Sequence, residues 1–273
     1  MKFDNKLIVS DIDGTFIDEN KLVSERNIDA VNYFKENGGL FTFATGRCDK
    51  VITPDLVKLT NAPIICCNGA YIYDFETQRR INEICIAPGP AITMINTLLE
   101  SFPGICVTIT ADRKYYLLGN INDKYKKEML IENEEIMSIP IEEIPTNQWY
   151  SIILSGDPST LDLATKYLSV AGENTYFVTR SWETMLEIYN IRASKGVAAL
   201  ELKHMCETRA QNTHFTLYSI GDYENDVDLL KSSDLSACPS NAHASIRDVA
   251  NITVCSNNDG AIAGLIEYID ANV

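Results

Sequence analysis

The stretch Leu7-Ile8-Val9-Ser10-Asp11-Ile12-Asp13-Gly14-Thr15 decides the fold. Its first four residues predict a buried strand, and two aspartates and a glycine follow directly. Side chains at i and i+2 of an extended chain project to the same side, so we expect Asp11 and Asp13 to reach out together at the strand's carboxyl end. Open α/β sheets bind their ligands there. Two such carboxylates repel each other unless one holds a proton or a cation such as Mg²⁺ lies between them. An ordinary strand with an Asp-Gly turn explains this stretch alone equally well.

Composition limits the classes of protein and partner. The 273 residues suffice for one large or two medium domains. A net charge of −15 argues against nucleic acid or an anionic membrane as partner, and it means that any anion site needs local cations. The eight cysteines include no C-x-x-C pair and are expected to be reduced core residues. We expect a cytoplasmic protein, because no signal peptide and no apolar run of about 18 residues is evident.

The order of predicted elements indicates one α/β domain made from both ends of the chain. Short connections join predicted strands and helices in a β-α-β-α-β order, which is typical of a parallel sheet. The strands are expected at 7–10, 40–44 and 63–67, the helices at 24–37 (capped by Ser24) and 48–59, and a hairpin at 70–84. The same order returns with helices near 194–205, 222–231, 242–250 and 261–269 and strands at 215–220, 235–238 and 252–254.

A different pattern separates these two parts. Helices are expected near 91–102, 123–135 and 158–170, and strands at 104–110, 114–118, 150–155, 175–179 and 185–189. We therefore predict a Rossmann-like catalytic core of residues 1–85 and 190–273, with an inserted α+β cap over 86–189. A cleft between two such domains is the default place for a ligand.

Three polar segments each follow a predicted core strand. They are Asp11-x-Asp13, Thr45-Gly46-Arg47 and Gly221-Asp222-x-x-Asn225-Asp226. The carboxyl ends of parallel strands meet at one edge of a sheet, so Asp11, Asp13, Asp222 and Asp226 are expected to form one acidic cluster. A divalent cation makes such a cluster stable. Asp222 and Asp226 share one helical face if a helix begins there. Taken alone, the third segment also fits an acidic turn that caps a helix.

Candidate phosphate ligands lie near the same edge. Thr45 offers a hydroxyl and loop N–H groups, and Lys195 lies just inside a helix that Ser194 is expected to cap. A lysine is not favoured at a helix N-terminus by the helix dipole, although a solvated first-turn lysine remains an alternative. Arg47 fits a clamp for a substrate oxyanion and a surface salt bridge equally well.

Four motifs in this order and spacing resemble the haloacid dehalogenase-like phosphatases. They are Asp11-Ile12-Asp13-Gly14-Thr15, Thr45-Gly46-Arg47, Lys195 and Gly221-Asp222-x-x-Asn225-Asp226. With Asn68-Gly69-Ala70, Asn241-Ala242 and Asp259-Gly260, the chain is similar to the Cof-type branch, subclass IIB. The stretch Pro239-Ser240-Asn241 departs from the family's glycine-containing approach, which leaves the role of Asn241 open.

The resemblance implies a role for each motif. Asp11 is the implied nucleophile and forms an aspartyl-phosphate, and Asp13 is the implied proton donor and acceptor. For that task the pKa of Asp13 is expected to lie well above about 4. The implied Mg²⁺ ligands are Asp11, the Asp13 carbonyl and Asp222, with Asp226 either as a further ligand or as a residue that supports the ligands. The implied phosphate and substrate contacts are Thr45, Gly46, Arg47, Asn68, Lys195 and Asn225, and Asn225 is expected to orient Lys195 or a neighbouring ligand.

We therefore predict a Mg²⁺-dependent phosphatase for small phosphomonoesters, most plausibly sugar phosphates or related metabolites. A phosphomutase that passes the phosphoryl group to a second sugar hydroxyl is one alternative. A non-catalytic module that binds phosphorylated metabolites is another. The expected partner is a small phosphorylated metabolite, with neither nucleic acid nor membrane, and the expected state is a monomer or small homo-oligomer.

Overall fold

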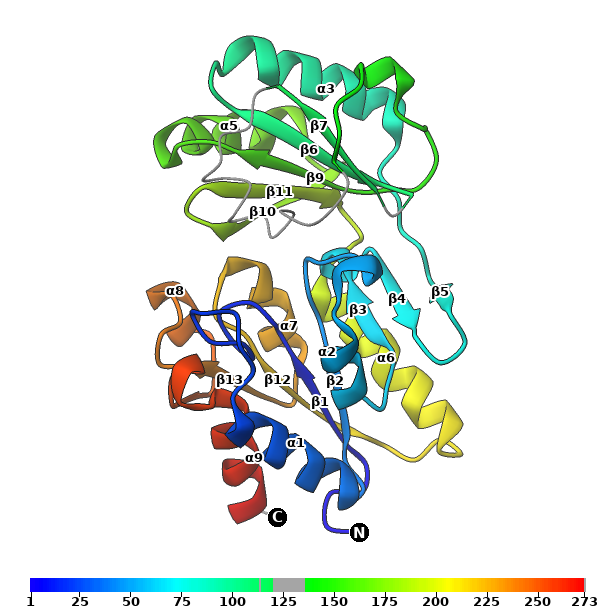
Figure 1. Cartoon of the computed structure of the whole chain (residues 1–273), viewed down its shortest axis with the longest axis vertical. Helices are drawn as coiled ribbons and strands as arrows, with labels where there is room; N and C mark the ends of the chain where they lie inside the picture. Colours follow the sequence, from blue (N-terminus) through cyan, green and yellow to red (C-terminus); the bar gives the residue numbers. More distant parts are fainter. Residues whose placement is uncertain (113, 120–135, 273) are drawn as a thin grey trace. The chain divides into compact units, whose positions relative to one another are not determined.

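The computed structural model describes residues 1–112, 114–119 and 136–272. The chain forms two compact units (Figure 1): one combines Met1–Glu83 with Ser194–Val273, and the other is Ile84–Ala193. The second unit begins two residues before and ends four residues after the predicted insert of 86–189. Each unit has its own sheet.

The first unit is built on a five-stranded parallel sheet of order β14-β13-β12-β1-β2. Its strands are β1 (Lys6–Ser10), β2 (Leu40–Phe43), β12 (Thr216–Ile220), β13 (Leu235–Pro239) and β14 (Ile252–Val254). The opening strand β1 lies between β12 and β2, with Val9 opposite both Ser219 and Thr42. Buried Leu7 and Val9 belong to the core that also contains Leu202. The opening motif therefore follows the carboxyl end of a buried strand that is paired on both sides, and the buried strand is the one that the sequence predicts.

The third predicted strand of this unit belongs to a separate small sheet. Strands β3 (Ile64–Cys66), β4 (Tyr71–Asp74) and β5 (Arg79–Ile81) pair antiparallel in the order β3-β4-β5. A single parallel bridge, Ala44 to Ile65, joins β2 to β3. The expected hairpin at 70–84 is present as β4 and β5.

Helix caps agree with the sequence at two important positions. Ser24 caps α1 (Glu25–Glu36) by accepting a hydrogen bond from the Asn27 N–H at 3.2 Å. Ser194 caps α6 (Lys195–Arg209) by accepting one from the Val197 N–H at 3.1 Å. Each serine satisfies an N–H that the helix itself leaves without a partner. The first residue of α6 is thus Lys195.

Two expected helices are shorter than predicted. The segment 48–59 forms a 3₁₀ turn at Asp49–Val51 and then α2 (Pro54–Leu59). Pro54 has no N–H and its ring fixes φ, so it begins a helix more readily than it continues one. Only Ala244–Arg247 (α8) is helical within the expected 242–250. The remaining helices of this unit are α7 (Val227–Ser232) and α9 (Ala261–Ala271).

The second unit combines a six-stranded sheet with α3 (Pro88–Ser101) and α5 (Pro158–Ala171). The sheet has the order β10-β11-β9-β6-β7-β8. Its strands are β6 (Cys106–Ala111), β7 (Lys114–Leu118), β8 (Ile136–Met137), β9 (Trp149–Ser155), β10 (Tyr176–Trp182) and β11 (Met185–Asn190). Alternate residues such as Val107, Ile109 and Ile152 join the helices in one buried core. The short strand β8 was not predicted, and the expected helix at 123–135 lies outside the described residues.

Thiols and membrane segments give two further observations. The eight cysteines lie in the described ranges as free thiols, and six of them are buried, which agrees with the expected reduced core residues. Within residues 1–112, 114–119 and 136–272, no helix has the length and apolarity needed to cross a membrane.

Candidate active site

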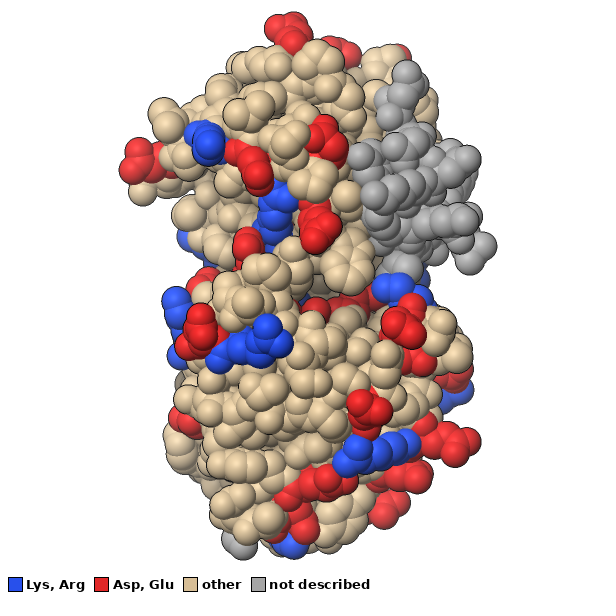
Figure 2. All heavy atoms as spheres, turned by 90° about the vertical axis from the view of Figure 1, so that its left-hand side faces the viewer, with Lys and Arg blue, Asp and Glu red and all other residues tan. Residues whose placement is uncertain are grey.

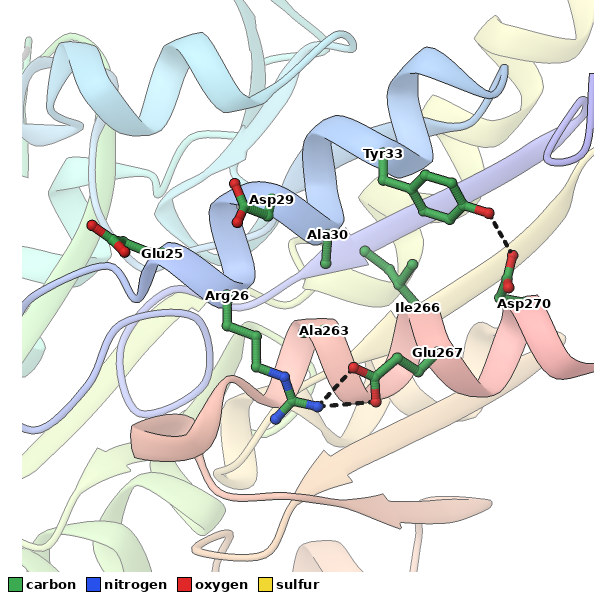
Figure 3. Close-up of a pocket in the computed structure, with 9 residues that line it drawn as sticks. All are labelled: Glu25, Arg26, Asp29, Ala30, Tyr33, Ala263, Ile266, Glu267 and Asp270. Atoms are coloured by element: carbon green, nitrogen blue, oxygen red, sulfur yellow. Dashed lines mark hydrogen bonds and ion pairs between the residues drawn. The ribbon is translucent and has the colours of Figure 1, made fainter.

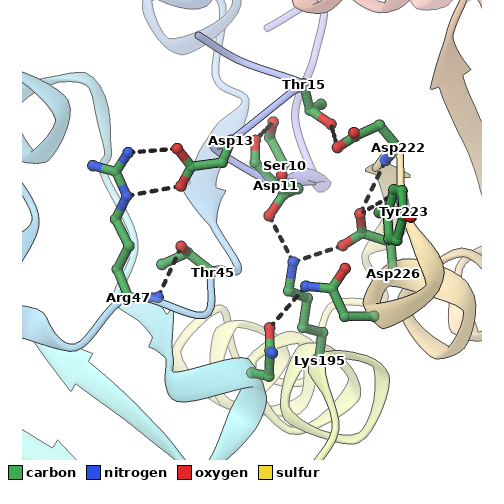
Figure 4. A network of polar contacts seen from close by, with 12 residues as sticks. Ser10, Asp11, Asp13, Thr15, Thr45, Arg47, Lys195, Asp222, Tyr223 and Asp226 are labelled. Atoms are coloured by element: carbon green, nitrogen blue, oxygen red, sulfur yellow. Dashed lines mark hydrogen bonds and ion pairs between the residues drawn. The ribbon is translucent and has the colours of Figure 1, made fainter. Parts of the chain in front are cut away.

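The carboxyl ends of β1 and β12 bring three carboxylates together (Figure 4). The two strands pair in parallel, and the Asp11 N–H extends their ladder by donating to the Ile220 carbonyl at 2.9 Å. Oxygens of Asp11, Asp222 and Asp226 all lie within 4.8 Å of one another, and all three residues are buried. The acidic cluster that the sequence predicts is therefore present, except that it does not include the Asp13 side chain.

Lys195 supplies the positive charge inside this cluster. Its Nζ donates to Asp11 Oδ1 at 2.6 Å and to Asp226 Oδ1 at 2.7 Å, and its side chain is completely buried. Burial disfavours a charged ammonium, but the two carboxylates outweigh this and hold the pKa of Lys195 above its ordinary value. The alternative of a solvated first-turn lysine is excluded.

Hydrogen bonds fix Asp226 from its own loop and Asp222 from the opening motif. Asp226 Oδ2 accepts from the N–H groups of Asp222 at 2.9 Å and Tyr223 at 3.3 Å, and Asp222 Oδ1 accepts from the Thr15 hydroxyl at 2.8 Å. Asp226 belongs to a 3₁₀ turn at Glu224–Asp226, and α7 begins after it. The two aspartates would share a helical face only if a helix began at Asp222; α7 begins after Asp226 instead, and the loop folds back on its own N–H groups.

Burial and mutual repulsion both raise the free energy of the charged carboxylates in this cluster. Burial, with the nearby charge of Asp226, raises the pKa of Asp222 to about 7. Burial also raises the pKa of Asp11 well above its ordinary value; Lys195 opposes this shift, and Asp226 and Asp222 add to it. Three carboxylates beside one ammonium leave a net negative charge that a cation would neutralise. The donor set consists of hard oxygen ligands and fits Mg²⁺.

Asp13 points away from the cluster and into a separate ion pair. Arg47 Nε donates to Asp13 Oδ2 at 2.8 Å, and Arg47 Nη2 donates to Asp13 Oδ1 at 2.7 Å. Lys21 Nζ lies 3.4 Å from the same Oδ1. Burial favours the protonated acid, but the bonds and charges of Arg47 and Lys21 outweigh it and hold the pKa of Asp13 below its usual range. The expectation of a pKa well above about 4 is therefore wrong for this state of the site.

The remaining predicted contacts lie on the neighbouring loops. Thr45 is buried, and its Oγ1 accepts from the Arg47 N–H at 3.1 Å across Gly46. Asn225 Nδ2 donates to Asn68 Oδ1 at 3.3 Å, whereas the recorded bonds of Lys195 go to Asp11 and Asp226. Asn225 therefore joins the loop after β12 to the loop after β3; of the two expected partners, Lys195 or a neighbouring ligand, the observed one is Asn68, itself a predicted substrate contact.

Sequence reasoning left Asn241 open and did not select Thr15 or Lys21. Asn241 Nδ2 donates to the Gly14 carbonyl at 2.9 Å, and its Oδ1 accepts from the Asn257 N–H at 2.9 Å. It thus ties the turn of the opening motif to the C-terminal loops. Thr15 could have been found from its place in the motif, but no spacing signals Lys21.

Two glycines let the loops approach closely enough to form the site. Gly14 has φ +83°, and a Cβ there would lie 2.4 Å from Asp222 Oδ2. Gly69 has φ +90°, and a Cβ there would lie 2.1 Å from the Ser194 carbonyl oxygen, directly before Lys195. Only glycine combines this backbone conformation with so little space.

A pocket of about 560 Å³ lies elsewhere on the first unit, along α1 and α9 (Figure 3). Two pairs of its lining side chains bind each other: Arg26 Nη2 donates to both oxygens of Glu267 at 2.8 and 2.9 Å, and the Tyr33 hydroxyl donates to Asp270 at 3.1 Å. None of the predicted site residues lines it. Among the described residues on the face shown in Figure 2, basic side chains are interspersed with acidic ones and form no extended basic patch.

Buried carboxylates and a buried lysine gather at the strand ends of the parallel-sheet unit, where open α/β sheets bind their ligands. Residues 8–266 match the haloacid dehalogenase-like hydrolase family, and the chain belongs to that family. A Streptococcus pyogenes protein named provisionally as a phosphatase is 25% identical over 96% of this chain and 97% of its own length. The pyridoxal phosphate phosphatase of Escherichia coli is 23% identical, with coverage of 96% and 97%.

Solved structures share the fold. One is described as a subclass IIB sugar phosphatase of this enzyme superfamily; it is 17% identical, its TM-score is 0.81, and the match covers 96% of this chain and 98% of that one. The predicted α/β class with a parallel-sheet core is confirmed, as is the resemblance to the haloacid dehalogenase-like family. The protein is an enzyme of the phosphatase class within this family, as the sequence predicts.

Proposed function

We propose that the protein is a Mg²⁺-dependent phosphatase that hydrolyses small phosphomonoesters, such as sugar phosphates and related metabolites, through an aspartyl-phosphate on Asp11. One observation carries the proposal. Asp11 and Asp13, two residues apart, have separate partners: Asp11 binds Lys195 inside the acidic cluster, and Asp13 binds Arg47 outside it. Two similar carboxylates in different environments can perform two different tasks.

Asp11 is the proposed nucleophile. Its carboxylate oxygen forms the bond to phosphorus as the bond from phosphorus to the leaving oxygen breaks, and a water molecule later releases inorganic phosphate from Asp11. Lys195, which is charged and fully buried, supplies a fixed positive charge to the phosphoryl oxygens, and the Thr45 hydroxyl is a further contact. When bound to Asp11, Asp222, Asp226 and the Asp13 carbonyl, Mg²⁺ would neutralise charge on the phosphoryl group.

Asp13 is the proposed acid and base. It gives a proton to the leaving oxygen and later takes one from the attacking water. Arg47 holds both of its oxygens and thereby fixes the direction of the carboxylate. The same two bonds stabilise the charged form, so Asp13 gains proton affinity only when an arriving anion shares Arg47.

The substrate class is supported by similarity. The relatives that match over nearly their whole length include phosphatases named for pyridoxal phosphate and for a phosphoribitylamino-uracil. Both names describe small soluble phosphomonoesters. We assign the unit Ile84–Ala193 as the cap that selects the substrate. A cytoplasmic monomer or small homo-oligomer fits the free thiols and small substrates.

The test is release of inorganic phosphate from p-nitrophenyl phosphate and from a panel of sugar phosphates, with Mg²⁺ present. We expect free phosphate with every ester that is turned over. Formation of an isomerised sugar phosphate without free phosphate would establish the phosphomutase instead. Binding of the sugar phosphates without any turnover would establish the non-catalytic module.

A further inference from the structure

The segment of residues 240–243, between β13 and α8, binds two loops of the proposed Mg²⁺ site. Asn241 Nδ2 donates to the Gly14 carbonyl at 2.9 Å, and the His243 N–H donates to the Asp222 carbonyl at 3.0 Å. Gly14 belongs to the opening motif, and Asp222 belongs to the loop after β12. The 240–243 segment therefore holds the backbone of both loops at the point where they meet.

The two loops contact each other through the Asp222 carboxylate. The Thr15 hydroxyl donates to Asp222 Oδ1 at 2.8 Å (Figure 4). Asp222 Oδ2 lies so close to Gly14 that a Cβ added there would be 2.4 Å away. Each oxygen of this carboxylate thus lies against one of two consecutive residues of the opening motif. A shift of the turn at Gly14 would therefore change the direction in which the carboxylate faces a cation.

Both ends of the Asn241 amide are hydrogen-bonded. Asn241 Oδ1 accepts from the Asn257 N–H at 2.9 Å, and Asn257 Nδ2 in turn donates to the Ile17 carbonyl at 3.0 Å. The chain that follows the opening motif is thus held at Gly14 and again at Ile17. Asn257 is buried, whereas Asn241 is exposed. Because Asn241 fills no part of the core, replacing it removes these bonds without leaving a buried cavity.

We propose that Asn241 is a positioning residue for the Mg²⁺ site: it holds the turn at Gly14 against Asp222 and thereby sets the affinity for the cation. The inference rests on the proposed function, because Asp222 serves as a cation ligand only if the enzyme uses Mg²⁺. Replacing a residue that holds a metal ligand in place changes metal affinity by about 10- to 100-fold. Asn241 acts through the backbone of the turn, so we expect an effect near the lower end of this range.

The experiment measures Mg²⁺ binding directly, by calorimetric titration of the full chain with magnesium chloride in the absence of substrate. Wild type is compared with Asn241→Ala, and circular dichroism verifies that the variant is folded. We expect the dissociation constant for Mg²⁺ to be about tenfold higher in Asn241→Ala. This result does not depend on turnover. An unchanged dissociation constant would overturn the inference.

Asn251→Ala is the matched control for a purely structural role. Asn251 is also exposed, and its Oδ1 accepts from the Ser236 N–H at 2.7 Å and from the Ser236 hydroxyl at 3.0 Å. These bonds hold the start of β13, whereas Asn241 follows the end of the same strand. Asn251→Ala should lower the melting temperature and leave the dissociation constant for Mg²⁺ unchanged. An equal rise of this constant in both variants would overturn the inference.

A double-mutant cycle with Thr15→Val tests the route through the turn. This substitution removes the hydroxyl that binds Asp222 Oδ1 and keeps a similar side-chain volume. If Asn241 acts on the same carboxylate through the turn, the two substitutions disturb one shared contact. The double variant should then lose less Mg²⁺ affinity than the product of the two single effects. Effects that multiply independently would contradict this route and overturn the inference.

Failure of the proposed function gives a different result. If the wild type itself binds no Mg²⁺, the proposal of a Mg²⁺-dependent enzyme fails, and the inference about Asn241 fails with it. If the wild type binds Mg²⁺ and Asn241→Ala binds it equally well, the proposed function stands and only the inference fails.

Discussion

Arg47 binds both carboxylate oxygens of Asp13, at 2.7 and 2.8 Å, across 34 positions of the chain. This bond pattern fixes the plane of the carboxylate as well as its position. It also separates Asp13 from Asp11, which the opening motif places only two residues away. The predictions below follow from this separation and from the loop packing around it.

Replacing Arg47 should misplace Asp13. Arg47→Ala removes both bonds, and we expect kcat to fall roughly 100-fold, because a small error in the position of a reacting group has about this cost. Steady-state kinetics on p-nitrophenyl phosphate measures the change. Arg79→Ala is the control, since Arg79 lies exposed on β5. Equal kcat for wild type and Arg47→Ala would show that the ion pair does not orient Asp13.

Asp11→Asn should remove the nucleophile while preserving its shape. The amide can still accept a hydrogen bond from Lys195, so the fold should persist. We expect turnover to fall by roughly three or more orders of magnitude, with an unchanged circular dichroism spectrum. Near-normal turnover would remove Asp11 from the proposed role.

Mg²⁺ should stabilise the protein as well as activate it. A cation that binds the folded carboxylate cluster raises the melting temperature by mass action. We expect EDTA to abolish activity, Mg²⁺ to restore it, and the Mg²⁺-dependent rise in melting temperature to shrink in Asp222→Asn. Asp55→Asn, on the exposed part of α2, serves as control. Full turnover in EDTA would contradict the cation argument.

Gly69→Ala should destabilise the first unit. The added Cβ would lie 2.1 Å from the Ser194 carbonyl oxygen, in a backbone with φ +90°. We expect a loss of about 2 kcal/mol or more in the free energy of unfolding, measured with urea. Gly89→Ala, where no atom lies within 4 Å of the new Cβ, should cause no loss. Equal free energies of unfolding for the two variants would show that the loop after β3 can shift away from α6 without loss of stability.

Asp157 should contribute stability that depends on pH. Hydrogen bonds from Ser159 and Thr160 lower its pKa to about 2 at the start of α5. A lowered folded-state pKa stabilises the fold above the unfolded value of about 3.9, and this contribution is lost as pH falls toward about 2. The melting-temperature difference between wild type and Asp157→Ala should therefore shrink between about pH 5.5 and 3. A constant difference would contradict the assignment.

Strand ends and caps were predictable from sequence because they follow local rules. The apolar run before Asp11 predicts β1, and Ser194 predicts the start of α6 and hence the place of Lys195. The acidic cluster follows from parallel strands that end at one edge. Contacts between side chains of different loops follow no such local rule. Arg47 fitted two alternatives equally, and the sequence does not show that it binds Asp13.

The pKa expectation for Asp13 failed for the same reason. The proposed role of Asp13 indicates which protonation state the reaction needs. Its pKa, however, depends on partners such as Arg47 and Lys21. Similarly, the spacing of Asp222 and Asp226 suggested a helical face, but the N–H groups of their own loop bind Asp226 first.

The close contact between Gly14 and Asp222 determines how the site would respond to a substitution at position 14. The volume in which any other residue would place its Cβ is filled by the Asp222 carboxylate. A larger residue at position 14 would therefore meet a functional group rather than the hydrophobic core. Its first effect would be displacement of one cation ligand, and the surrounding sheet could remain intact. In this turn, the missing side chain of Gly14 leaves the space that the Asp222 carboxylate, a proposed cation ligand, occupies.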